Sequence, residues 1–199
     1  MRKIPTLFKK LYDSDDKFIG VSHEFTNDIC EEAFKHGVPT VKFDGSACAI
    51  IDGKLYKRYD YRGKGVLPEN CIPCQAHEDL EGHFPVWLPC KPSTGEDKWF
   101  YAAYYNYPRK WVDGTYEAVG KHFNGNVYNL DYDILVKHGG IVIRESLKSY
   151  EEIEAYLRTH NIEGIVWWLN GEPCCKIRRK DFFIKWGSDI KADRFNILG

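Results

Sequence analysis

A lysine, an acid and a glycine stand close together in the run Val41-Lys42-Phe43-Asp44-Gly45. Charged and apolar residues alternate in this run, and such alternation predicts a half-buried strand, here followed by a turn. Lysine usually lies on an exposed face of a protein, and these five residues fit that interpretation equally well. The alternative is that the Lys42 amine is a nucleophile, which requires burial or like charges nearby to favour the neutral amine.

A predicted hairpin positions a second basic residue, Arg58. Asp52-Gly53 separates two strand-like runs, residues 47–51 and 54–59, and a two-residue Asp-Gly loop predicts a type I′ turn. Opposed residues in a hairpin share a face of the sheet, so we expect Arg58 beside Ala47, shortly after the Lys42–Gly45 turn. The register predicts three pairs: Ile51 with Lys54, Ala49 with Tyr56, and Ala47 with Arg58.

A second predicted hairpin, around Asn170-Gly171, brings an acid and two bases together. Glu163, Lys176 and Arg178 are expected on one face of it. They form either a surface salt-bridge cluster, which contributes little stability, or a site for a metal and phosphates, and the spacing leaves both interpretations open. The register predicts four pairs: Leu169 with Glu172, Trp167 with Cys174, Ile165 with Lys176, and Glu163 with Arg178.

Glu117 stands among apolar and aromatic residues in the short strand-like run 114–120. A carboxylate in that position is either an edge-strand charge or a group that accepts hydrogen bonds from a sugar. The Asn124-Gly125-Asn126 sequence that follows is ordinary turn chemistry.

Strand patterns outnumber helix patterns along the chain. Strands are expected in residues 40–60, 114–121, 140–145 and 163–178, whereas residues 63–98 are rich in Gly and Pro and predict loops. The clearest helix is 149–160, which Ser149 and Glu152 would open as a capping box. A weaker helix is expected in 26–36, ending at Gly37. We therefore expect an α+β fold with mainly antiparallel sheets.

Composition limits the classes of protein to which the chain can belong. Its 199 residues suit one domain, and 43% hydrophobic residues are enough for a core. A net charge of −1 excludes a histone-like basic protein, so a nucleic-acid partner would need a local basic patch. No apolar run approaches the ~20 residues that span a membrane, and no signal-peptide core is evident. We expect a soluble intracellular protein located in the cytoplasm.

Seven cysteines fit a reducing compartment, because their number is odd and their spacing gives no disulfide framework. Three of the cysteines and two nearby histidines have spacing like that of zinc ligands: Cys71, Cys74, His77, His83 and Cys90. Zinc takes tetrahedral sets of Cys and His, but the second Cys-x-x-Cys or His-x3-His half is missing. A loop with buried thiols explains these residues equally well.

Four segments, in order, resemble the covalent nucleotidyltransferase superfamily of ATP-dependent RNA and DNA ligases and mRNA capping enzymes. They are Lys42–Gly45, Tyr116–Gly120, Glu163–Val166 and Lys176–Arg178. Within this superfamily the chain is most similar to the small 5′-3′ RNA ligases of vertebrates, bacteria and phages. The likeness spans nearly the whole chain, through the stretches RKIPTLFK, KFDGSA, LYKRYD, IPCQ, GTYEAVG, EGIVW and KIRRKDF.

The resemblance implies an ATP-dependent RNA ligase that seals 5′-phosphate and 3′-hydroxyl RNA ends. Lys42 would carry AMP, and Asp44 would orient the lysine or a metal-bound water. Glu117 would bind the ribose, and Glu163 would hold Mg²⁺ or Mn²⁺. Lys176 and Arg178 would bind the phosphates. One adenylation domain over residues 1–199, acting as a monomer, is the expected organisation.

The chain departs from the family pattern at two places. Many ligases carry Arg two residues after the glycine of the first motif, where this chain has Ala47; we expect Arg58 to supply that guanidinium. The sequence also ends soon after the last motif, and we expect an adenylation domain without a C-terminal OB-fold. Two alternatives remain: a DNA nick ligase with the same chemistry, and a zinc-stabilised binding module built on Cys71, Cys74, His83 and Cys90.

Overall fold

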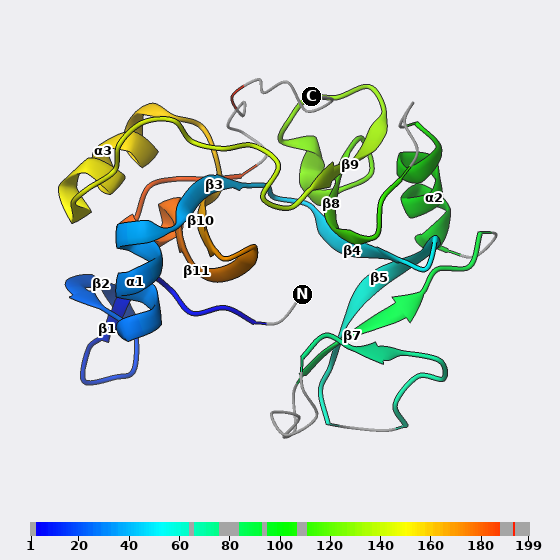
Figure 1. Ribbon diagram of the computed structural model, residues 1–199, viewed down its shortest axis with the longest axis horizontal. Helices are drawn as coiled ribbons and strands as arrows, with labels where there is room; N and C mark the ends of the chain where they lie inside the picture. The colour runs from blue at the N-terminus through cyan, green and yellow to red at the C-terminus, as the bar shows by residue number, and fades with distance from the viewer. Residues whose placement is uncertain are drawn as a thin grey trace. The chain divides into compact units, whose positions relative to one another are not determined.

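The computed structural model describes residues 3–63, 66–75, 84–92, 95–106, 111–187 and 193 (Figure 1). The chain divides into two compact units. Unit 1 contains Asp44–His138, and unit 2 contains Ile4–Phe43 with the described residues from Gly139 onward. The fold is α+β with mostly antiparallel sheets, as expected, while a single adenylation domain over residues 1–199 stays a prediction. No helix in the described part of the chain is long and apolar enough to cross a membrane.

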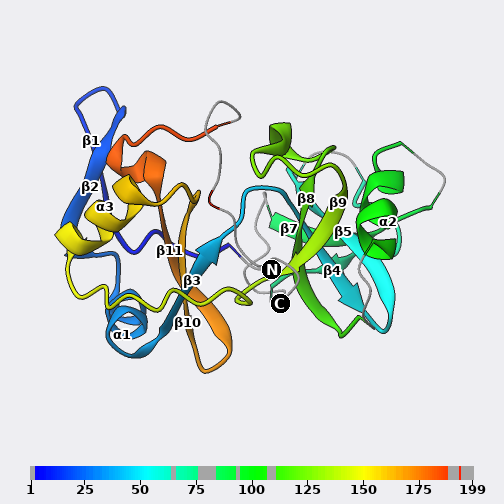
Figure 2. The same cartoon turned by 90° about the horizontal axis from the view of Figure 1, so that it is seen from above.

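Unit 1 is built on a six-stranded antiparallel sheet with the strand order β6-β7-β5-β4-β8-β9. Helix α2, Asp97–Tyr105, packs against β5, β8 and β9 of this sheet (Figure 2). The strands are β4 (Ser46–Ile51), β5 (Lys54–Tyr61), β6 (Ile72–Pro73), β7 (Phe84–Pro89), β8 (Gly114–Gly120) and β9 (Asp133–Lys137).

The core of unit 1 follows from alternation along these strands. Cys48 and Ile50 of β4 are buried on the face that α2 covers, and Phe100 of α2 packs into the same cluster with Tyr116 of β8. Alternate residues of a strand point to opposite faces. The other face of the sheet therefore carries Ala47 and its neighbour across the ladder, Glu117.

The Asp52-Gly53 hairpin confirms two of the three predicted pairs. Both residues of the turn have positive φ, 51° and 70°, as a type I′ turn requires. The ladder pairs Ile51 with Lys54 and Ala49 with Tyr56 and ends at Cys48 and Lys57. Beyond that point β4 pairs only with β8, and β5 pairs only with β7. The predicted Ala47–Arg58 pair therefore lies just past the end of the ladder, where the two strands separate.

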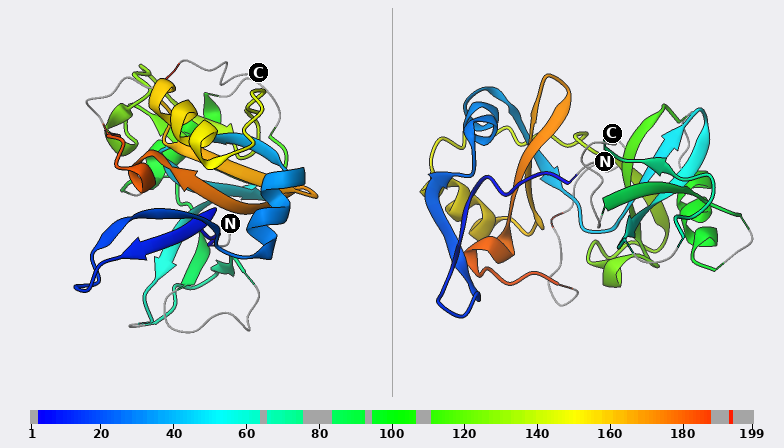
Figure 3. Two further views of the ribbon diagram at one scale, coloured as in Figure 1. Left: turned by 90° about the vertical axis from the view of Figure 1, so that its left-hand side faces the viewer. Right: turned by 90° about the horizontal axis from the view of Figure 1, so that it is seen from below.

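Unit 2 contains a three-stranded sheet in the order β11-β10-β3 and a two-stranded sheet of β1 and β2. Helix α1 packs against β10 and β11 (Figure 3). The elements are β1 (Phe8–Tyr12), β2 (Phe18–Phe25), α1 (Asp28–His36), β3 (Val38–Lys42), α3 (Tyr150–Thr159), β10 (Gly164–Leu169) and β11 (Glu172–Arg178).

Helix α3 begins as the sequence predicts, whereas α1 begins two residues later than expected. The Ser149 side chain accepts the Glu152 N–H at 3.2 Å and caps α3. In α1 the cap is Asn27, which accepts the Cys30 N–H at 2.9 Å, so this helix starts two residues after Thr26. The expected strand 140–145 is wrong: the structure has only an isolated bridge between Thr40 and Val142 in this region.

The predicted register of the second hairpin is wrong after its first pair. Asn170-Gly171 forms the turn and Leu169 pairs with Glu172, as expected. An irregularity between Trp167 and Trp168 then shifts the ladder by one residue. Pro173 stands at this point, and because proline has no N–H to give to a ladder, it is typical of bulges. The observed pairs are Trp168–Pro173, Trp167–Cys175, Val166–Lys176, Ile165–Ile177 and Gly164–Arg178, which replace the three predicted pairs Trp167–Cys174, Ile165–Lys176 and Glu163–Arg178.

Candidate functional site

Three of the predicted cationic residues share one face of the sheet of unit 2. Lys42 of β3 lies opposite Gly164 of β10, and Gly164 lies opposite Arg178 of β11. Lys176 precedes Arg178 by two residues and therefore points to the same face. The intervening residues Val41, Ile165 and Ile177 are buried. The bulge does not disturb this grouping, because it moves Lys176 and Arg178 together.

Glu163 reaches this face from the residue just before β10. Its Oε2 accepts a hydrogen bond from Lys42 Nζ, and the two side chains are only 15% and 24% exposed. Lys42 Nζ also lies 3.4 Å from the carbonyl oxygen of Phe43. The amine is thus held by a carboxylate from a distant part of the sequence, and the hairpin pattern, which grouped Glu163 with Lys176 and Arg178, did not predict this pair.

Gly164 is required between Lys42 and Arg178. A Cβ atom at this position would lie 2.2 Å from the carbonyl oxygen of Ile177 and 2.9 Å from the Cα of Arg178. Both atoms belong to the backbone of β11, so any other residue would push the strands apart. Because β10 and β11 approach closely at this glycine, the position of Glu163, the residue just before β10, is fixed relative to the sheet.

Arg178 is oriented by an acid that the sequence reasoning missed. Its Nε and Nη2 donate to the carboxylate oxygens of Asp181 at 3.2 and 2.9 Å, and its backbone N–H donates to the same carboxylate. Asp181 is buried and belongs to the 3-10 turn Arg179–Phe182. Its place three residues after Arg178 is the signal that could have identified it, because acids at this spacing cap turns.

The strand that carries Lys176 is covered at its edge by the start of the chain. The Lys176 N–H donates to the carbonyl oxygen of Pro5 at 3.0 Å, and its carbonyl accepts the Leu7 N–H at 2.7 Å. Leu7 is fully buried. This pairing fixes the backbone on both sides of Lys176.

In unit 1 side chains from other elements hold the Asp44-Gly45 turn through hydrogen bonds. The Asp44 N–H donates to the hydroxyl of Tyr128 at 2.6 Å, and the Gly45 N–H donates to Glu117 Oε1 at 3.1 Å. The Asn124 amide donates to Asp44 Oδ1 at 2.8 Å and to the carbonyl of Gly45 at 2.7 Å. A Cβ at position 45 would lie 2.2 Å from the carbonyl oxygen of Ala118, so only glycine fits.

Glu117 has a second partner that was not predicted. Its Oε2 lies 2.8 Å from His138 Nε2, and both side chains are 12% exposed. In the part of the chain that the structure describes, His138 Nδ1 is buried without a hydrogen-bond partner. A carboxylate needs a donor, so Nε2 carries the proton in this pair. Sequence alone gave no signal for His138, because a Lys-His pair at the end of an apolar strand is an ordinary polar strand end.

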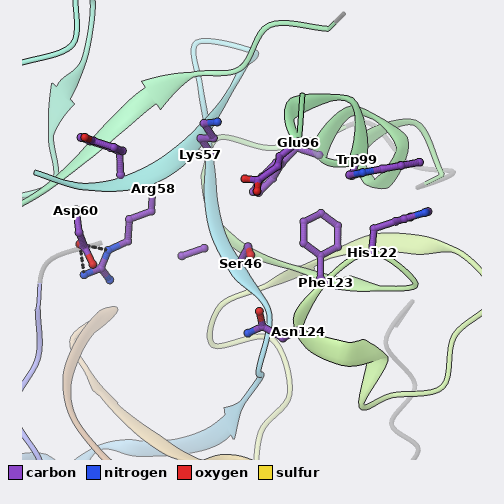
Figure 4. Close-up of a pocket in the computed structure, with 12 residues that line it drawn as sticks. Ser46, Lys57, Arg58, Asp60, Glu96, Trp99, His122, Phe123 and Asn124 are labelled. Atoms are coloured by element: carbon purple, nitrogen blue, oxygen red, sulfur yellow. Dashed lines mark hydrogen bonds and ion pairs between the residues drawn. The ribbon is translucent and has the colours of Figure 1, made fainter. Parts of the chain in front are cut away.

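Arg58 lines a pocket of about 610 Å³ within unit 1, together with Ala47, Ser46 and Asn124 (Figure 4). Its Nε and Nη2 donate to Asp60 Oδ1 at 3.1 and 3.0 Å. Ala47 and Arg58 thus line the same pocket, but the predicted pair between them is not part of the β4–β5 ladder.

The seven predicted site residues divide between the two units. Unit 2 carries Lys42, Glu163, Lys176 and Arg178, and unit 1 carries Asp44, Arg58 and Glu117. One peptide bond, between Phe43 and Asp44, joins the two groups at the first motif.

The cysteines are free thiols, and the residues that the structure describes contain no cluster of three or more His, Cys, Asp or Glu side chains able to hold a metal. Cys71 and Cys74 are half-buried and Cys90 is buried, and burial raises the pKa of Cys90 to about 12. His77 and His83 lie outside the described residues.

No family model matches the chain, and no curated protein matches it significantly in sequence.

Proposed function

We propose that the protein is an ATP-dependent RNA ligase that forms a lysyl-AMP intermediate on Lys42. The observation that supports this most is the ion pair between Lys42 and Glu163 on a sheet face that also carries Lys176 and Arg178. Lysine, glutamate and two further cations are the groups that adenylation by lysine needs: a nucleophile, an oxygen donor for a metal, and charges for phosphates.

The first reaction joins Lys42 to AMP. The deprotonated amine attacks the α-phosphorus of ATP, a P–N bond forms, and the bond to the bridging oxygen of pyrophosphate breaks. Lys176 and Arg178 stabilise the charge that develops on the phosphate oxygens, and such stabilisation is usually the largest contribution in phosphoryl transfer. The Asp181 carboxylate holds the Arg178 guanidinium in one orientation for this purpose.

The ion pair has to open before the amine can react. Glu163 offers carboxylate oxygens, which suit Mg²⁺ or Mn²⁺ as hard oxygen ligands, and Mg²⁺ typically uses one or two carboxylates and keeps its waters. A bound divalent cation would supply Lewis-acid polarisation of phosphate oxygens. Withdrawal of Glu163 from Lys42 would free the amine on the sheet face that also carries Lys176 and Arg178.

Two further steps complete the sealing reaction. An oxygen of a 5′-phosphate end attacks the lysyl-AMP phosphorus and displaces the Lys42 amine, which takes up a proton. A 3′-hydroxyl then attacks the 5′-phosphate, its proton leaves, and AMP departs as the new phosphodiester forms.

Glu117 and the Asp44-Gly45 turn are suited to hold the nucleoside of ATP. A carboxylate has about four acceptor sites, so Glu117 can bind Gly45 and His138 and still accept from a ribose hydroxyl. Its two protein partners keep the oxygens in one place.

The proposal is tested by incubating the protein with ATP, Mg²⁺ and RNA strands that carry a 5′-phosphate and a 3′-hydroxyl. We expect joined RNA that resists phosphatase, with ATP preferred over GTP. A parallel assay on nicked duplex DNA separates RNA sealing from DNA sealing, and product only from nicked DNA would contradict the RNA assignment.

A further inference from the structure

Arg179 is a buried arginine in unit 2 that stands directly after Arg178, at the start of the 3-10 turn that follows β11. Only 5% of its surface is exposed. Burial lowers the pKa of its guanidinium, and the negative charge of Asp193 opposes this effect. An apolar side chain would fill the same space without the cost of burying a charge. What the guanidinium binds therefore indicates what it contributes.

The Arg179 guanidinium binds oxygen atoms from two segments of the chain. Its Nη1 donates to the carbonyl oxygen of His160 at 2.7 Å and to Oδ1 of Asn161 at 3.2 Å. Its Nε donates to the carbonyl oxygen of Lys185 at 2.9 Å. A guanidinium is a planar fork of fixed donors, so these bonds hold the oxygens in one arrangement. His160 and Asn161 belong to the connection between α3 and β10, which also contains Glu163.

The backbone of Arg179 binds Glu163 directly. Its N–H donates to the carbonyl oxygen of Glu163 at 3.0 Å. Within the same connection, Ile162 is 1% exposed and its N–H donates to the carbonyl oxygen of His160 at 3.0 Å. The residue whose side chain pairs with Lys42 is thus held through its own carbonyl and through the connection that precedes it.

These contacts fix Glu163 on the side that the sheet leaves open. On the other side, Gly164 is already held in the ladder between Lys42 and Arg178. The Glu163 side chain reaches Lys42 from the residue just before the strand, so a shift of this connection moves the carboxylate away from the amine. Misplacement of a reacting group by about 1 Å can cost about 100-fold in rate.

We propose that Arg179 is a positioning residue that keeps the Glu163 carboxylate beside Lys42. Its expected effect on adenylation rests on the proposed function. Its effect on the Lys42–Glu163 pair does not, and that effect can be measured without ATP.

The first measurement is the rate of lysyl-AMP formation from ATP and Mg²⁺, followed by intact-mass spectrometry in the wild type, Arg179→Met, Glu163→Ala and the double variant. Arg179→Met should slow adenylation at least about 10-fold. In the Glu163→Ala protein, the same change should slow it by less than about 2-fold, because two residues that act through one group are not additive. A loss of folded protein would instead lower both rates by the same factor.

The second measurement is the rate at which acetic anhydride acetylates Lys42, read by peptide mass spectrometry in the absence of ATP. Glu163→Ala gives the rate for a Lys42 that has lost its partner. Arg179→Met should shift the Lys42 rate in the same direction. Arg179→Lys keeps a charged donor and should shift it less.

Two further variants complete the test. Asn161→Ala removes one acceptor of the guanidinium and keeps the buried charge, so it serves if Arg179→Met does not fold. It should shift the Lys42 rate in the same direction by a smaller amount. Arg158→Met is the matched control, because Arg158 is an exposed arginine in the last turn of α3, and its rates should equal those of the wild type.

Arg179→Met or Asn161→Ala protein that acetylates Lys42 at the wild-type rate would overturn the assignment. So would Arg179→Met that slows adenylation by the same factor with and without Glu163. Wild-type protein that forms no lysyl-AMP, together with an Arg179→Met protein that shifts Lys42 acetylation as Glu163→Ala does, would contradict the ligase proposal and support the positioning of Glu163 by Arg179.

Discussion

Lys42 and Glu163 form an ion pair across the edge of the β3–β10 ladder, although 121 residues separate them in the sequence. Both side chains are mostly buried, and each lies next to the backbone pair between Lys42 and Gly164. The pair ties Lys42 of β3 to the start of β10 within unit 2, and its two members are the residues on which the proposed chemistry depends most.

Replacement of Glu163 by Ala should lower the rate of lysyl-AMP formation at least ~100-fold, because it removes a charge from a site where phosphate charge develops. The rate is measured by intact-mass spectrometry after timed incubation with ATP and Mg²⁺. Glu172→Ala is the control, since Glu172 is an exposed acid on the same hairpin. Equal rates for the wild type and Glu163→Ala would reduce the ion pair to a structural feature.

Lys176→Ala should also slow adenylation at least ~100-fold, whereas Lys180→Ala, an exposed lysine four residues later, should leave it unchanged. Lys176→Arg keeps the charge and should recover part of the rate. Thermal melting is measured beside the kinetics; the backbone bonds of Lys176 to Pro5 and Leu7 do not involve its side chain, so the substitution leaves them in place. A Lys176→Ala protein that melts normally and adenylates normally would remove Lys176 from the site.

Arg58→Ala should be severely impaired in RNA sealing, and the double variant Ala47→Arg, Arg58→Ala should recover part of the activity. The reason is that positions 47 and 58 line the same pocket from neighbouring strands. Sealing of 5′-phosphate RNA to 3′-hydroxyl RNA is the measurement, and Arg62→Ala, at an exposed position just after β5, is the control. Full sealing by Arg58→Ala would show that the guanidinium has no part in the reaction.

His138→Ala should raise the KM for ATP about 10-fold with a smaller effect on kcat, the order of magnitude expected when a hydrogen bond to a charged group is lost. It should also reduce the preference for ATP over 2′-deoxy-ATP, because His138 orients Glu117 toward the ribose. His122→Ala is the matched control, since His122 pairs with a different carboxylate, Asp133. Unchanged discrimination in His138→Ala would leave His138 as a packing residue.

The sequence predicts local structure well where short-range chemistry dictates it. The Asp52-Gly53 turn fixes the β4–β5 register because both turn residues adopt positive φ, and Ser149 caps α3 through its own side chain. The error at the second hairpin has an equally local cause. The turn rule continues the register without interruption, but Pro173 cannot donate to the ladder and shifts it by one residue.

The partners of the predicted site residues were not predictable in this way. Asn124 looks like ordinary turn chemistry, yet its amide holds Asp44 and Gly45. Tyr128 and His138 meet the turn and Glu117 only because β8 and β9 pair and bring them there. Such contacts depend on the pairing of strands that are distant in the sequence, which local sequence patterns do not predict. The fold class was accessible from strand patterns, and Lys176 and Arg178 share a face because two residues separate them on β11. Their grouping with Lys42 was not accessible in this way, because it depends on the long-range pairing of β3 with β10.

The central claim is that Lys42 carries AMP. It is tested most directly by incubating the protein with ATP and Mg²⁺, digesting it, and locating the AMP adduct by tandem mass spectrometry. The account predicts one adduct, on Lys42, that is sensitive to acid as a phosphoramidate is, and that is absent from a Lys42→Ala protein with an unchanged circular dichroism spectrum. An adduct on another residue, or an undiminished adduct in Lys42→Ala, would contradict it.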